Sequence, residues 1–170
     1  RPAFARASVP TVNLDRYRLA ESFESLAGYT RMSRTLTGSG TPVQIRGEEV
    51  TSNIFAVLGV SAAIGRVFVP NEGAPGGPRM VILMDAFWRA TFGGDRAIVG
   101  RTLTFDGQPH TIIGVMPPGF RGLSEHGTPR VEIGGERLAI GVQVLAAGGR
   151  ALALVRERVA VALDLLHLAQ

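Results

Sequence analysis

The chain has 170 residues, which is enough for one domain with a substantial buried core. It carries a net charge of +4 and contains no cysteine, which excludes disulfides, thiolate metal sites and cysteine nucleophiles. Every basic residue other than histidine is an arginine, and the arginines are scattered rather than interleaved with aromatic residues. That distribution is more typical of a GC-rich genome than of a nucleic-acid surface, so no nucleic-acid partner is expected.

Residues 1–13 contain two prolines and no clear period, which predicts a linker or an extended segment. From Leu14 to Ala27 the apolar residues recur at helical spacing, which predicts an amphipathic helix that Asn13 caps and Gly28 ends. The first residue is Arg1 rather than methionine, which is typical of a fragment or a processed product.

Two strands are expected next, at Tyr29–Leu36 and at Val43–Val50, the second interrupted by Gly47 and two glutamates. Neighbouring residues of a strand point to opposite faces, so Glu48 and Glu49 cannot act on one substrate. We therefore expect this pair to mark a solvated edge rather than an acid/base site.

A short helix is predicted after Ser52 or Asn53, with Ile54 and Phe55 facing inward and Gly59 at its end. The glycine-rich segment 73–78 then resembles a phosphate-binding loop in composition only. A phosphate loop connects a strand to a helix N-terminus, whereas this segment leads into a strand, and no GKS or GKT follows it. A surface loop is the better interpretation.

The run Met80–Met84 is continuously apolar, as expected of a strand buried on both faces. Asp85 occupies the position of an N-cap, and we expect a capping role rather than catalysis because no partner base follows. On the helix behind it, Trp88 and Phe92 are expected to stack four residues apart, and Gly93 to end the helix.

A hairpin is predicted from the alternation of Leu103 and Phe105 with polar residues, followed by the turn Asp106–Gly107. Its return strand runs from His110 to Met116 and is closed by Pro117 and Pro118.

Nothing in these residues predicts an enzyme. His110, His126 and His167 have no second ligand at a recognised spacing, and surface positions explain all three. There is no GxSxG motif, and we expect no catalytic residue, cofactor or metal.

Three segments in order resemble one family: LDRYRLAESFESLAGYTRMSRTLTGSGTPVQIRGEEV, VTSNIFAVLGVSAAIGRVF and FWRATFGGDRAIVGRTLTFDGQPHTIIGVMPPGF. They are similar to the MacB-like periplasmic core domain of FtsX-like ABC transporter permeases, of the large type common in soil bacteria. The resemblance covers residues 13–123 and implies an α+β fold, a mixed sheet with short helices packed on it. It divides the chain into a linker (1–13), the core domain (14–123) and a divergent tail (124–170).

The resemblance also singles out family-motif positions, for which we expect structural roles. Gly59 and Gly65 permit tight turns, Arg66 pairs locally rather than binding a ligand, and the aromatic residues are core. The motif positions are Asn53, Phe55, Leu58, Gly59, Gly65, Arg66, Phe68, Trp88, Phe92, Gly93, Gly100, Arg101, Gly114, Pro117, Gly119 and Phe120.

What the resemblance implies is a mechanical domain on the extracytoplasmic side of the inner membrane, anchored in the full-length protein. Its expected partners are transmembrane helices of the same permease, a separate cytoplasmic ABC ATPase and a periplasmic adaptor protein. The alternative is a free periplasmic binding or adaptor module with the same fold.

The tail after residue 123 differs in composition, because all aromatic residues of the chain precede it. A helix is expected at 151–168, where apolar residues recur at spacings of three and four, interrupted too often by charges for a membrane span. The competing hypothesis is a frameshift near residues 121–135, which would leave an end that does not pack on the core.

Overall fold

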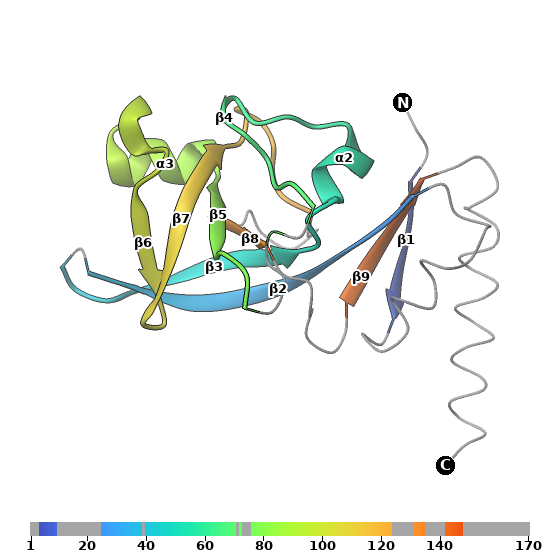
Figure 1. Ribbon diagram of the computed structural model, residues 1–170, viewed down its shortest axis with the longest axis horizontal. Coiled ribbons are helices and arrows are strands. Elements are labelled where there is room, and N and C mark those ends of the chain that lie inside the picture. Colours follow the sequence, from blue (N-terminus) through green and yellow to red (C-terminus); the bar gives the residue numbers. More distant parts are fainter. Residues whose placement is uncertain are drawn as a thin grey trace, which may run out of the picture.

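A computed structural model describes residues 4–9, 25–38, 40–70, 72, 76–123, 131–134 and 142–147. Over these residues the fold is the expected α+β type, a mixed sheet with short helices packed against it (Figure 1). The described elements are β1 (Phe4–Val9), β2 (Ser25–Thr37), β3 (Val43–Val50), α2 (Ile54–Leu58), β4 (Ile64–Gly65), β5 (Met80–Leu83), α3 (Asp85–Phe92), the 3₁₀ helix η2 (Arg96–Ile98), β6 (Thr102–Phe105), β7 (Gln108–Val115), β8 (Val131–Gly134) and β9 (Val142–Ala147).

Six of the strands form a closed circuit. Antiparallel pairs join β2 to β3, β8 to β5, β7 to β6 and β6 back to β2, while β3–β8 and β5–β7 are parallel. The circuit is a small barrel, and closure removes the exposed edges that an open sheet of these strands would present. We call these six strands the barrel.

Three strands lie outside the barrel. β4 adds to β7, and β9 pairs with the first part of β2 and carries β1 on its other side. In this register Ala147 lies opposite both Phe4 and Ser25. The start of β1, the start of β2 and the end of β9 therefore meet at one corner, from which β2 runs into the barrel (Figure 1).

The hydrophobic core follows from the apolar segments identified in the sequence. Val81, Ile82 and Leu83 of β5 are fully buried, as predicted for a strand covered on both faces. The hairpin of β6 and β7 turns at Asp106 and Gly107, both with positive φ (49° and 76°), as a type I′ turn requires. The Asp106–Gly107 turn and α3 lie at opposite ends of β6 and β7 (Figure 1).

Helix α3 begins one residue earlier than the sequence predicted, because Asp85 was expected to be the N-cap. Met84 is the N-cap, and Asp85 is the first helical residue, makes no capping hydrogen bond and instead accepts from Arg89 at 3.0 Å. The prediction that Trp88 stacks on Phe92 was also wrong. The ring that contacts Phe92 is that of Phe87, edge to face with the ring centroids 5.8 Å apart. Gly93 ends the helix in the left-handed conformation, as predicted.

The N-terminal expectations need two corrections. Of the two alternatives for residues 1–13, the linker is wrong for residues 4–9, which are extended as strand β1 and paired with β9 along its length. Ser25–Ala27 begin β2 rather than end a helix, and Gly28 lies inside this strand, where its N–H donates to Thr51 Oγ at 3.0 Å. The remainder of the predicted helix, 14–24, lies outside the described residues.

The prediction of a solvated edge at Glu48–Glu49 was also wrong. β3 is continuous and lies inside the sheet, between β2 and β8, and Glu48 is 1% exposed. Gly47 does not interrupt the strand either. A Cβ there would lie 2.6 Å from Met32 Cε and 2.8 Å from the Val131 carbonyl oxygen. Glycine therefore lets the Met32 side chain of β2 and the backbone of β8 approach β3 closely.

The tail contributes two strands to the sheet. β8 lies between β3 and β5 in the barrel, and β9 joins β1 to β2. Each of these strands is paired on both sides, which is inconsistent with a chain end that does not pack on the core, so the frameshift hypothesis fails for them. The helix expected at 151–168 lies outside the described residues.

Candidate functional site

Three motif aromatics that are distant in sequence form one cluster beside β4. The ring of Phe55 in α2 stacks on that of Phe68 with centroids 5.9 Å apart, and meets that of Phe120 at 6.1 Å. Phe55 and Phe68 are buried and Phe120 is partly exposed. The cluster ties α2, the segment after β4 and the segment after β7 together by burial of aromatic surface.

The backbone beside this cluster is held by two motif glycines that face each other in the β4–β7 pair. Gly65 has a φ of 72°, and a Cβ added there would collide with the carbonyl oxygen of Ile113. A Cβ at Gly114 would collide with the carbonyl oxygen of Arg66. The contact needs glycine on both sides, because hydrogen bonds such as Arg66 N–H to Ile113 O (2.9 Å) hold the strands close.

The local pairing expected of Arg66 is present. Its guanidinium donates to both carboxylate oxygens of Glu72, at 2.8 and 2.7 Å, and Glu72 also accepts from Val69 N–H at 2.9 Å. Glu72 is 6% exposed, and the hydrogen bonds from Arg66 hold its pKa below the ordinary value of 4.5. The bidentate pair closes the loop after β4 and engages the Arg66 guanidinium.

A second group of motif residues holds the segment after α3. The indole of Trp88, 5% exposed, donates to the carbonyl oxygen of Asp95 at 2.9 Å. The Asp95 carboxylate caps η2 by accepting from Ala97 N–H at 2.9 Å, and lies 3.5 Å from the Arg101 guanidinium. Gly100 has a φ of 90° and donates to the carbonyl oxygen of Ile112 at 2.7 Å. This group joins α3 to the start of β6.

The remaining motif positions end or cap elements. Asn53 is the N-cap of α2 without a capping hydrogen bond from its side chain, and Gly59 ends α2 with a φ of 65°. Leu58 and Phe92 are partly buried against the core. Pro117 and Gly119 form the turn that follows β7, where Phe120 N–H donates to the carbonyl oxygen of Pro117 at 3.1 Å.

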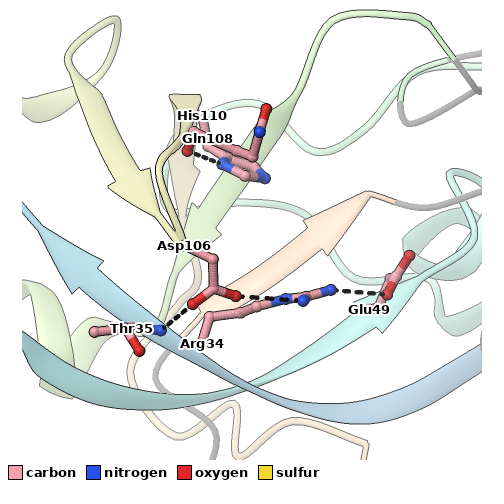
Figure 2. A network of polar contacts seen from close by, with 6 residues as sticks. All are labelled: Arg34, Thr35, Glu49, Asp106, Gln108 and His110. Atoms are coloured by element: carbon pink, nitrogen blue, oxygen red, sulfur yellow. Dashed lines mark hydrogen bonds and ion pairs between the residues drawn. The ribbon is translucent and has the colours of Figure 1, made fainter.

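Sequence reasoning missed a polar network where β2 meets β6. The Arg34 guanidinium lies between two carboxylates, 3.3 Å from Asp106 and 3.9 Å from Glu49 (Figure 2). The other oxygen of Asp106 accepts from Thr35 N–H at 2.8 Å. Burial raises the pKa of Glu49, and the charge of Arg34 acts in the opposite direction. Only the Asp–Gly turn was visible in the sequence, because the partners come from β2 and β3.

His110 borders this network and is not on the surface as predicted. It is 8% exposed, its ring meets Phe105 edge to face at 5.4 Å, and its Nδ1 lies 2.9 Å from the carbonyl oxygen of Gln108 (Figure 2). Burial lowers the pKa of His110, and Arg79 and Arg34 lower it further. His126 and His167 lie outside the described residues.

A buried carboxylate and a phenol hold both backbone polar groups of one residue, Leu123, on the other side of the sheet. Glu48 accepts from Leu123 N–H at 2.8 Å, and the Tyr29 hydroxyl donates to the Leu123 carbonyl oxygen at 3.0 Å. Leu123 is 3% exposed. These contacts anchor the segment that leads from β7 towards β8, and they give Glu48 a structural partner 75 residues away.

The contacts described above join loops and strands of the domain. Among the described residues no three histidine, aspartate or glutamate side chains come together as metal ligands. In the same part of the chain, no helix is long and apolar enough to cross a membrane.

The comparison with protein families decides the relationship. The model for the MacB-like periplasmic core domain matches residues 2–160. The chain belongs to this family. The match begins before and ends after the segment 13–123 that carried the resemblance, and it includes β1, β8 and β9. A comparison with curated proteins finds no match.

Solved structures share the fold at low sequence identity. The extracellular domain of the noncanonic ABC-type transporter YknZ from Gram-positive bacteria superposes with a TM-score of 0.66 at 15% identity, covering 84% of this chain and 74% of that one. The periplasmic region of MacB from Actinobacillus actinomycetemcomitans gives 0.66 at 15%, covering 88% and 70%. A domain of a putative permease from Porphyromonas gingivalis gives 0.59 at 12%, covering 85% and 72%.

Proposed function

We propose that the chain is the extracytoplasmic core domain of an ABC transporter permease and has no catalytic role of its own. In this proposal it couples movement of transmembrane helices in the same permease to the handling of a substrate or partner protein. A separate cytoplasmic ATPase drives the movement, and a periplasmic adaptor is a further candidate partner. The family match over residues 2–160 supports the proposal most directly.

The corner at which Phe4, Ser25 and Ala147 meet is the observation that links this fold to coupling. A domain inserted between two membrane segments needs both of its connections on the side that faces the membrane. β1 enters and β9 leaves at this corner, and β2 starts there. β2 has 13 residues, so it extends roughly 40 Å from the corner into the barrel. Displacement of the corner would therefore reach the barrel through a continuous strand.

The location is tested with single cysteines introduced into these 170 residues, which contain none, after any cysteine elsewhere in the full-length protein has been replaced by serine. Ser33→Cys, at an exposed position of β2, is introduced into the full-length gene product and treated with a membrane-impermeant maleimide in cells with a permeabilised outer membrane. We expect labelling without lysis. Ala27→Cys, at a fully buried position of the same strand, is the matched control and should react only after denaturation.

Coupling is tested in membrane vesicles that contain the permease and its ATPase. We expect the rate of labelling of Ser33→Cys to change when ATP is added, and to stay constant with an ATPase variant that cannot hydrolyse ATP. Labelling only after lysis would contradict the location. Recovery of the full-length protein in the soluble periplasmic fraction would support the free binding module instead.

A further inference from the structure

The links that close the barrel are unequal in length. β2 and β3 are paired from Tyr29 opposite Val50 to Leu36 opposite Val43. β2 and β6 are paired at only two positions, which we call the seam: Leu36 opposite Phe105 and Thr37 opposite Thr104. Since each strand pair is stabilised in proportion to its cross-strand neighbours, the seam is the weakest backbone link of the circuit.

The seam is extended by backbone and side-chain contacts from one residue, Asp106. Its backbone N–H donates to the carbonyl oxygen of Thr35 at 2.9 Å, and its carboxylate accepts from Thr35 N–H at 2.8 Å and from Arg34 at 3.3 Å. These contacts take the place of the strand pairs that would continue the seam along β2. The side chains of Arg34 and Asp106 are 44% and 41% exposed, so solvent competes for the contacts that the Asp106 carboxylate makes.

We propose that the seam opens as a local unit while the rest of the barrel stays paired, with Asp106 as the residue that holds it closed. β2 runs from the corner of Phe4 and Ala147 to the seam, whereas β6 is held on its other edge by β7. Opening separates the end of β2 from the β6–β7 hairpin and converts the closed barrel into an open sheet. The opening is a property of the fold and does not depend on the transport role.

Native-state hydrogen exchange of the 170-residue chain in increasing urea tests the proposal. The readouts are two backbone amides, that of Asp106, which bonds across the seam, and that of Met116, which donates to Leu83 O at 2.8 Å inside the barrel. We expect exchange at Asp106 to be nearly independent of urea, because local opening exposes little surface, and exchange at Met116 to follow global unfolding. Equal urea dependence of both amides would overturn the proposal.

Two variants separate the role of Asp106 from a general loss of stability. Asp106→Gly removes the carboxylate and keeps the positive φ that the turn needs, and should lower the protection factor at position 106 about tenfold after correction for intrinsic rates. Arg101→Ala, which breaks an exposed ion pair of similar geometry away from the seam, is the control and should leave that protection unchanged. An unchanged protection factor in Asp106→Gly would overturn the assignment of Asp106.

A disulfide across the seam gives an independent result in this cysteine-free chain. Thr37 and Thr104 lie directly opposite each other, so the double variant Thr37→Cys/Thr104→Cys places two sulfurs within reach of a bond. Combined with Asp106→Gly, the oxidised form should restore protection at position 106, and reduction should remove it. Failure of the oxidised form to slow exchange would contradict opening at the seam.

Discussion

The two ends of the β6–β7 hairpin are held by different forces. At one end α3 buries Phe87 and Trp88, 7% and 5% exposed. At the other end the seam joins β6 to β2 through two cross-strand pairs, of which Leu36 with Phe105 is buried, and its outer part depends on the half-exposed contacts of Asp106. Burial of an aromatic side chain stabilises a fold by several times the net contribution of an exposed ion pair. The hairpin is therefore anchored by burial at the α3 end, whereas the outer part of the seam, at Asp106, depends on exposed polar contacts.

Removing the indole at the α3 end should give the largest effect. Trp88→Ala loses the buried ring and the hydrogen bond to the Asp95 carbonyl, and should lower the free energy of unfolding by about 3–5 kcal/mol. Urea unfolding followed by circular dichroism measures it, because Trp88 is the only tryptophan and its fluorescence is lost with the substitution.

The neighbouring arginine is the control for this prediction. The Arg89 side chain is 61% exposed, pairs with Asp85 and lies over the Trp88 ring at 5.3 Å. Arg89→Ala should leave the urea midpoint close to that of the wild type. A shift as large as that of Trp88→Ala would mean that the α3 end is held by charge and not by burial.

Glu48 tests whether burial or polarity decides how strongly a contact stabilises the fold, because its carboxylate makes a polar contact in a buried position. Glu48→Ala leaves the Leu123 N–H without its acceptor and should lower the free energy of unfolding by about 1–3 kcal/mol. Glu48→Gln keeps an oxygen acceptor at the same place and should cost less. Both are measured by urea unfolding with the fluorescence of Trp88. Equal losses in the two variants would show that the Leu123 hydrogen bond is not what Glu48 contributes.

The segments that were predicted well are those whose structure is decided by near neighbours. The apolar run Met80–Met84, the alternation around Leu103 and the Asp106–Gly107 turn each carry a local signal, and the structure has β5, β6 and the hairpin there. The glycines that end helices in the left-handed conformation, such as Gly59 and Gly93, were also predicted from a local signal.

The errors occur where a partner distant in sequence decides the outcome. The sequence predicts that Gly47 interrupts the strand, because the close approach of Met32 and Val131 cannot be predicted locally. It predicts that Glu48 is solvated, because its hydrogen-bond donor, the Leu123 amide, is distant in sequence. β1 pairs with a strand that begins more than a hundred residues later, so no local period reveals it. Within the site, the pairing of Arg66 was predictable because Glu72 is near in sequence, whereas Arg34, Asp106 and His110 are joined only by the barrel.

His110 gives the smallest expected effect and tests the polar end of the hairpin by pH. Its pKa in the folded chain is lowered from the ordinary value of 6.5, chiefly by burial and further by Arg79 and Arg34, while the Gln108 carbonyl and Asp106 act in the opposite direction. Below pH 6.5 the unfolded chain therefore binds a proton at this residue more readily than the folded chain does. The contribution of His110 to the free energy of unfolding is fully present above pH 6.5 and is lost as the pH falls through the pKa of the folded state. The loss is at most about 1.4 kcal/mol per pH unit for one proton.

The non-titrating variant His110→Gln isolates this contribution. Between about pH 7 and 5 the wild type should lose more stability on acidification than the variant, in urea unfolding followed by Trp88 fluorescence. His126 and His167 are present in both proteins, so their titration cancels in the difference. The lowered pKa of Glu72 acts only below its ordinary value of 4.5, outside this window. Parallel pH profiles for the two proteins would mean that the folded chain binds a proton at His110 as readily as the unfolded chain, and that water reaches the ring through the seam end of the barrel.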